Sequence, residues 1–149
     1  MDTDSYRYLR CEKCGQINRL PELKFASGAV PNCGKCKSSL SLQQKPAPVT
    51  DHNFKQFISA PVPVLIDFWA EWCGPCHALA PTIEKIAQEF AGRILVGKLN
   101  TDENIATASG FQIRGIPTMI LFRDGREVDR LVGVQPKAEI SRRIQTLLR

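Results

Sequence analysis

The six cysteines of this 149-residue chain fall into three pairs, and two residues separate the cysteines of each pair. The pairs are Cys11/Cys14, Cys33/Cys36 and Cys73/Cys76. Two sulfurs at this spacing can share one metal ion or exchange a disulfide with a substrate, whereas frameworks of structural disulfides are typical of secreted proteins. The spacing therefore indicates metal binding, redox catalysis or both.

The third pair stands where a buried strand is expected to end and a helix to begin. Residues 62–69 form an apolar run interrupted only by a proline and Asp67, which is typical of a central strand. A sulfur at the start of the following helix faces unpaired N–H groups and the positive end of the helix dipole, which stabilise a thiolate. Cys73 is therefore predicted to attack a substrate disulfide and Cys76, one turn further on, to resolve the mixed disulfide. Gly74 and Pro75 set a tight turn that brings the two sulfurs within bonding distance.

The elements that position this pair follow from the apolar periodicity beyond residue 49. Helices are expected at residues 51–59, 73–90, 104–109 and 137–148. Strands are expected at residues 62–69, 94–99, 118–122 and 128–132, the last two joined by a hairpin at Asp124-Gly125. This pattern predicts an α/β domain in which helices cover both faces of a mixed central sheet.

The first two pairs have the spacing of a zinc site. Eighteen residues separate Cys14 from Cys33, within the 15–20 expected between the knuckles of a four-cysteine site. Gly15 and Gly34 allow backbone N–H groups to turn toward the sulfurs. Because four thiolates leave no open position, the site is predicted to be structural. We expect one zinc ion bound by Cys11, Cys14, Cys33 and Cys36. The alternative is that these four cysteines form two disulfides or remain free thiols.

Apolar content divides the chain into two domains. Residues 1–42 carry too few large apolar side chains for a core of their own, and a segment this short usually needs a metal or disulfides to fold. They are predicted to form a small zinc-ribbon-like module. Residues 43–49 are predicted to be a linker that contains prolines, and residues 50–149 form the α/β domain.

The segment Trp72-Cys73-Gly74-Pro75-Cys76 matches the active-site signature of the thioredoxin family, which residues 46–149 resemble throughout. The resemblance implies the thioredoxin fold and a protein-disulfide reductase, a thiol–disulfide oxidoreductase without a bound organic cofactor. The four-cysteine module resembles the N-terminal part of the zinc-containing bacterial subclass, thioredoxin 2. With it, the resemblance covers nearly the whole chain.

The resemblance also assigns roles outside the cysteine pair. Asp67, in a strand where a carboxylate is costly to bury, matches an aspartate that exchanges a proton with the resolving cysteine. Lys98 matches the lysine beside that aspartate, although a solvated lysine is an alternative interpretation. Pro117 matches a cis-proline that faces the active site. The substrate groove is expected to be lined by Trp72, Gly74, Pro75, Gly115, Ile116, Val132 and Gly133.

Two residues depart from the family pattern. His77 stands where a lysine is common directly after the second cysteine, and Thr101 occupies a groove position that is often aliphatic. His77 is expected to be exposed.

Charge and hydropathy limit the classes of partner. The net charge is +5, of which residues 1–45 contribute +4, and four thiolates around one zinc ion would reduce that segment to about +2. Neither a concentrated basic stripe nor an apolar run of membrane-spanning length is present, so no nucleic-acid or membrane partner is expected. The acidic, polar residues 1–5 do not resemble a secretory signal, which favours a cytoplasmic location.

Three functions remain open at this point. The motif at residues 72–76 favours a reductase that acts on disulfide-containing proteins and is recharged by an NADPH-linked thioredoxin reductase, and a monomer is expected. Alternatively, the chain is a zinc-dependent binding module with the α/β domain as a scaffold. In a third hypothesis, oxidation of the zinc thiolates ejects the metal and tunes the reductase, which makes the protein a redox sensor.

Overall fold

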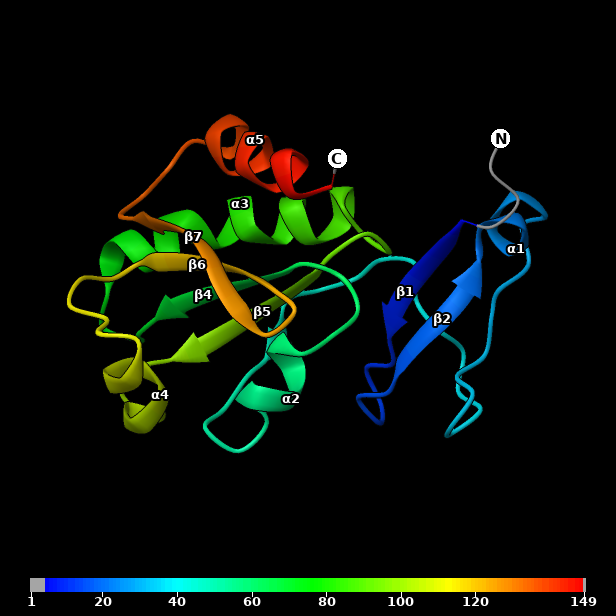
Figure 1. The fold of residues 1–149 in the computed structure, drawn as a ribbon, viewed down its shortest axis with the longest axis horizontal. Helices are drawn as coiled ribbons and strands as arrows, with labels where there is room; N and C mark the ends of the chain where they lie inside the picture. Colours follow the sequence, from blue (N-terminus) through cyan, green and yellow to red (C-terminus); the bar gives the residue numbers. More distant parts are fainter. Residues whose placement is uncertain (1–4, 149) are drawn as a thin grey trace.

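The computed structural model describes residues 5–148, which form two sheets (Figure 1). The N-terminal sheet is a hairpin of β1 (Tyr6–Arg10) and β2 (Ile17–Pro21), followed by the short helix α1 (Glu22–Ala26). The other elements are β3 (Ala47–Pro48), α2 (Phe54–Ile58), β4 (Val64–Trp69), α3 (Gly74–Glu89), β5 (Leu95–Asn100), α4 (Ile105–Gly110), β6 (Thr118–Arg123), β7 (Arg126–Val132) and α5 (Lys137–Leu147). Residues 1–4, on which the prediction about a secretory signal largely rests, lie outside the described residues.

The larger sheet is mixed, as predicted. Its strand order is β3-β5-β4-β6-β7, with β3, β5 and β4 parallel and β6 and β7 antiparallel to their neighbours. The register pairs Asp67 of the central strand β4 with Lys98 of β5 on one side and with Met119 of β6 on the other. The carboxyl end of β4 leads directly to the cysteine pair at the start of α3.

Helices cover both faces of this sheet (Figure 1). On one face, α3 and α5 pack against a core that includes Leu65, Ile83 and Ile144, all fully buried. On the other face, the rings of Phe54, Phe111 and Phe122 meet edge to face with centroids 5.2–5.6 Å apart. Burial of each such side chain stabilises the fold by roughly 1.5–3 kcal/mol. Both cores hold β4 rigidly behind the cysteine pair.

The predicted helices and strands of the larger domain are all confirmed, with ends shifted by at most three residues. The N-terminal hairpin was not predicted, and neither was β3. Ala47 and Pro48 fall in the segment expected to be a linker, yet they pair with Gly97 and Lys98 at the edge of the sheet. A strand of two residues is too short to show periodicity, and an edge position tolerates a proline because one side needs no N–H donor.

The hairpin docks on the loop that follows α3. The Tyr8 N–H donates to the Gly92 carbonyl at 2.9 Å, which makes an isolated antiparallel bridge between the two domains. Gly92 has φ of 88°, and a Cβ there would lie within 3.0 Å of three atoms of the Arg7 side chain. The Arg10 N–H adds a hydrogen bond to Gln44 Oε1 at 3.2 Å. Glycine at position 92 therefore permits the close contact of the two domains.

Candidate functional site

Cys73 and Cys76 form a disulfide at the N-terminus of α3, with their Cα atoms 5.3 Å apart. Cys73 is the N-cap residue, and its Sγ accepts a hydrogen bond from the Cys76 N–H at 3.2 Å. The first turn of a helix leaves its N–H groups without backbone acceptors, so one of them is directed at this sulfur. Pro75 fits there because its missing N–H would have had no partner. The start of the helix thus supplies the positive field that favours a thiolate at Cys73.

Exposure does not distinguish the two sulfurs in this oxidised form. Cys73 is 3% exposed and Cys76 is 2% exposed, so both residues are buried in the disulfide state. The difference between them lies in their contacts. Cys73 Sγ accepts the helical N–H and lies 3.8 Å from the Ile116 carbonyl oxygen, on the side of the predicted groove.

The loop at residues 115–117 faces the disulfide. The Ile116–Pro117 peptide bond is cis, as the family resemblance implies, and the Pro117 carbonyl accepts a hydrogen bond from the Gly133 N–H at 2.8 Å. A Cβ built on Gly115 would lie 3.9 Å from Val132 Cγ1, so this loop and the end of β7 are adjacent. The predicted groove residues of these two segments are therefore brought together beside Cys73.

Exposed residues on the helix side complete the surroundings of the disulfide. Trp72 is 71% exposed, and Gly74 and Pro75 are also exposed. The Trp72 indole N–H donates to Asp102 Oδ2 at 2.8 Å. Asp102 was not predicted as a site residue, because it lies 30 positions away in a turn with no motif.

Asp67 is fully buried behind the disulfide, and neither of its carboxylate oxygens has a hydrogen-bond partner among residues 5–148. Burial raises the pKa of Asp67 to about 6, and the positive charge of Lys98 limits the rise. Within the described residues Lys98 forms no ion pair with this carboxylate; its Nζ lies 4.6 Å from the centre of the Trp69 ring. A carboxyl group in this environment can take up and release a proton near neutral pH.

The two departures from the family pattern lie at the edge of this site. His77 is exposed, as predicted, and its Nε2 lies 2.7 Å from the Glu71 carbonyl oxygen. Its ring packs edge to face on Trp69, with centroids 6.1 Å apart. The Thr101 hydroxyl donates to the Trp69 carbonyl at 3.3 Å. Both side chains therefore make contacts within the protein that hold the segment before Cys73.

The four N-terminal cysteines converge in the hairpin module. Their Sγ atoms lie within 4.8 Å of one another, with Cys11–Cys36 and Cys14–Cys33 each 3.6 Å apart. A disulfide requires about 2.05 Å between sulfurs, whereas a tetrahedral ion with Zn–S bonds near 2.3 Å places them about 3.8 Å apart. The donor set therefore fits one tetrahedral metal ion and not two disulfides.

Thiol ionisation in this module also favours a cation. Backbone N–H groups of Cys36 and Lys35 lower the pKa of Cys33 to about 6. The Gln16 N–H acts in the same direction on Cys14, but burial and the neighbouring sulfurs raise the pKa of Cys14 to about 11. Four thiolates this close repel one another unless a bound cation balances their charge.

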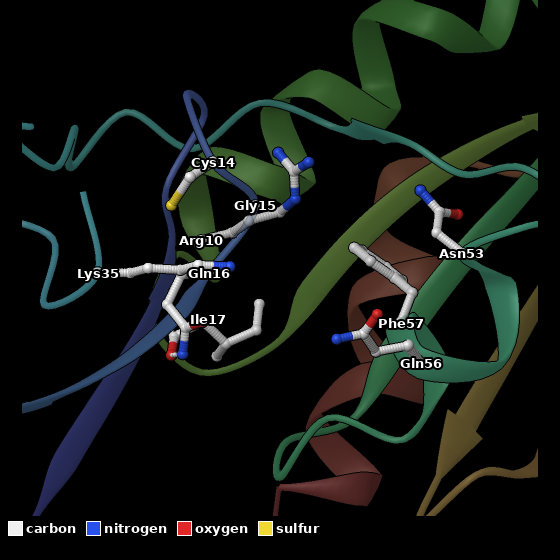
Figure 2. A pocket seen from close by; sticks show the side chains of 9 residues that line it. All are labelled: Arg10, Cys14, Gly15, Gln16, Ile17, Lys35, Asn53, Gln56 and Phe57. Atoms are coloured by element: carbon white, nitrogen blue, oxygen red, sulfur yellow. Dashed lines mark hydrogen bonds between the residues drawn. The ribbon is translucent and has the colours of Figure 1, made fainter.

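A separate cleft of about 500 Å³ lies between the two domains (Figure 2). Arg10, Lys35 and Ile17 line its wall on the hairpin side, and Asn53 and Phe57 line the opposite wall. None of the predicted substrate-binding residues contributes to it. The predicted substrate groove therefore lies outside this cleft.

A disulfide at the N-terminus of a helix, opposite a cis-proline loop and in front of a buried carboxylate, defines a thiol–disulfide oxidoreductase with the thioredoxin fold. The family model described as Thioredoxin matches residues 45–146, and the model described as Thioredoxin 2, N-terminal, matches residues 10–38. The chain belongs to the thioredoxin family. Thus the predicted family and fold are confirmed.

Individual relatives agree with this assignment. Thioredoxin 1 of Nostoc sp. is 50% identical over 100 residues, which are 66% of this chain and 94% of that protein. Thioredoxin C-3 of Corynebacterium nephridii is 40% identical over 131 residues, or 87% of this chain and 88% of that protein. The solved structure of a mutant thioredoxin from Halobacterium salinarum matches with a TM-score of 0.67 at 35% identity, covering 72% of this chain and 94% of that one.

Residues 5–148 contain five α-helices. None of them combines the length and the apolar character that crossing a bilayer requires.

Proposed function

We propose that the chain reduces disulfide bonds of other proteins with Cys73 as the attacking thiolate. In the reduced form, the Cys73 sulfur attacks one sulfur of the substrate disulfide, and the other substrate sulfur leaves as a thiolate. The Cys76 thiol then loses its proton and attacks the Cys73 sulfur, which releases the second substrate thiolate. Both electrons of the Cys73/Cys76 dithiol thereby pass to the substrate, and the enzyme is left with the internal disulfide seen here.

One observation carries this assignment of roles: the Cys76 N–H at the start of α3 donates to Cys73 Sγ. A sulfur that accepts a hydrogen bond at a helix N-terminus is stabilised as an anion and ionises at lower pH than a free thiol. In the second step Cys73 is the sulfur under attack, and the substrate thiolate is the leaving group.

Asp67 is proposed to take the proton from Cys76 during the second step. Its carboxyl is buried, lacks hydrogen-bond partners in the described chain and has a pKa of about 6, so both protonation states are accessible near neutral pH. Lys98 is proposed to stabilise the ionised form, since its positive charge opposes the effect of burial.

The substrate chain is proposed to bind across the cis-proline loop. The exposed side chains of Trp72 and Val132 offer apolar surface on either side of the disulfide, and Ile116 presents backbone groups beside Cys73. Gly74, Pro75, Gly115, Pro117 and Gly133 are proposed to complete this surface without side chains that would obstruct a polypeptide.

One zinc ion is proposed to be the metal of the hairpin module, held by Cys11, Cys14, Cys33 and Cys36. Zinc bound by four thiolates has no open position for substrate, so it would supply folding energy to the module and no step of the reaction. Residues 1–42 are proposed to be the metal module, and residues 50–149 the catalytic domain.

Family membership supports the proposed partners, and the polar sequence of residues 1–5 supports the proposed location. We expect a cytoplasmic monomer that acts on disulfide-containing proteins and is returned to the dithiol form by an NADPH-linked thioredoxin reductase. No nucleic-acid or membrane partner and no bound organic cofactor are proposed.

The test is an insulin-disulfide reduction assay with NADPH and a thioredoxin reductase. Turnover that depends on this chain is expected, and Cys73→Ser should abolish it. A Cys73→Ser variant with full activity would refute the assigned roles, and absence of turnover in the unmodified chain would refute the reductase function.

A further inference from the structure

Asn18 is a buried polar residue at the centre of the hairpin module, only 8% exposed. It lies in β2 opposite Leu9 of β1, and its side chain shares the interior of the module with the cysteine sulfurs. A primary amide buried without hydrogen bonds costs several kcal/mol, so its contacts show why an asparagine occupies this position.

Both ends of the Asn18 side chain are engaged. Nδ2 donates to the Gln16 carbonyl at 3.2 Å and lies 3.6 Å from Cys33 Sγ, within reach of an N–H···S hydrogen bond. Oδ1 accepts a hydrogen bond from the Gly34 N–H at 2.9 Å. The Gln16 carbonyl also accepts from the Cys11 N–H at 2.9 Å, so it belongs to the turn that carries the first cysteine pair. One amide group therefore connects the turns that carry both cysteine pairs.

We infer that Asn18 is a positioning residue of the metal site, which fixes the second cysteine pair against the first and donates a hydrogen bond to the Cys33 sulfur. This inference rests on the proposed metal site. Cys33 is completely buried, so its sulfur obtains no hydrogen bonds from water. Besides the backbone N–H groups of Cys36 and Lys35, the latter at 3.4 Å, the Asn18 amide is a side-chain donor that the structure places on it. A donor in this position draws negative charge from a metal-bound thiolate and orients it.

The donor and the acceptor of Asn18 are needed together. Aspartate has nearly the same shape, but it offers only acceptors and would place a negative charge beside the Cys33 sulfur. Leucine has a similar volume and would leave the Gly34 N–H and the Cys33 sulfur without this partner. Both substitutions are therefore expected to weaken the hold on the metal, for different reasons.

The experiment uses the full chain loaded with zinc, and it follows zinc transfer to a chromophoric chelator. Removal of an outer-shell partner typically costs 10–100-fold in metal affinity, and we expect zinc loss to accelerate about 10–100-fold in Asn18→Asp and Asn18→Leu. Asn32→Asp is the matched control because Asn32 belongs to the same module and is exposed. We expect its rate to stay within about twofold of the unmodified chain. Equal rates in all four proteins would overturn the inference.

A second readout separates positioning from a general loss of folding. With cobalt(II) in place of zinc, removal of the hydrogen bond to Cys33 should make the sulfur a better electron donor and move the sulfur-to-cobalt charge-transfer band of Asn18→Leu to longer wavelength. The band of Asn32→Asp should stay in place. An unmoved band in Asn18→Leu would overturn the proposed contact with Cys33, whatever the rate of zinc loss. If the unmodified chain itself binds neither metal, the proposed metal site fails first, and that outcome is distinct from equal behaviour of loaded proteins.

Discussion

Replacement of Asp67 by asparagine is predicted to raise the stability of the oxidised protein at pH 7 relative to its stability at pH 4. Burial raises the pKa of this carboxyl from its ordinary value of 3.8 to about 6, so the folded state disfavours the ionised form. Each pKa unit corresponds to 1.36 kcal/mol, and ionised Asp67 therefore destabilises the fold by about 3 kcal/mol at pH 7. Asparagine carries no charge at any of these pH values, so it removes the cost of ionisation while it keeps the shape of the side chain. Its buried amide lacks hydrogen-bond partners and adds a cost that is the same at every pH.

The pH dependence fixes the sign of the effect. Well below pH 3.8, the carboxyl is protonated in both the folded and the unfolded chain and costs nothing. Between pH 3.8 and about 6 the unfolded chain ionises first, so the free energy of unfolding falls as the pH rises. Above pH 6 the full cost is present. The effect of Asp67→Asn on the free energy of unfolding should therefore be about 2 kcal/mol more favourable at pH 7 than at pH 4.

The assay is urea unfolding of the oxidised full chain and of the variant at pH 4 and at pH 7. The difference in the free energy of unfolding between the two proteins is taken at each pH, so that effects on the metal module cancel. Asp124→Asn is the control, because Asp124 is exposed in the β6–β7 turn, and its effect should stay within about 0.5 kcal/mol. An effect of equal size at pH 4 and pH 7 would refute the conclusion that ionisation of Asp67 is penalised by burial.

Three further predictions concern resolution, docking and substrate binding. Cys76→Ser should accumulate a mixed disulfide between Cys73 and substrate, visible by mass spectrometry under non-reducing conditions; its absence would contradict the resolving role. Gly92→Ala should lower the free energy of unfolding by about 1–3 kcal/mol, because φ is 88° and the new Cβ meets Arg7 within 3.0 Å. Gly110→Ala is the control and should not lower it, because a Cβ at residue 110 has no atom within 4 Å. Asp102→Ala should release the indole of Trp72 and raise KM for protein substrates several-fold; unchanged KM for these substrates would count against the role of this hydrogen bond.

The redox pair could be predicted from the sequence because its determinants are local. A cysteine directly after a buried strand and at the start of a helix has a thiolate-stabilising environment whatever the rest of the fold does. Asp67 could be recognised for a similar reason, since one charged residue within an apolar strand must be buried if the strand is. The four-cysteine site was likewise predictable, since two short cysteine spacings at a suitable separation leave few other geometries for the sulfurs.

Contacts between distant backbone and polar groups could not be predicted in this way. The bridge from Tyr8 to Gly92 depends on a main-chain carbonyl and on a glycine whose need for positive φ becomes clear only once the hairpin is in place. The hydrogen bond from Asn18 to Cys33 joins residues 15 positions apart, and that from Trp72 to Asp102 joins residues 30 positions apart. Asparagine and aspartate are also common on ordinary surfaces. Such residues show no periodicity, so only the tertiary structure distinguishes them from solvated side chains.

Helix α3 separates the two cysteine sites, and this separation limits what the metal module can do. The redox pair lies at the N-terminus of α3, and the hairpin docks on Gly92, just beyond its C-terminus (Figure 1). At 1.5 Å per residue, the 16 residues of α3 span about 24 Å. The segment of a protein substrate that binds beside Cys73 is therefore expected to contact the catalytic domain. The docking contacts at Gly92 and the body of α3 form one route from the metal module to the redox pair. Gly92→Ala should weaken an effect of the metal on catalysis that uses this route while the groove stays intact.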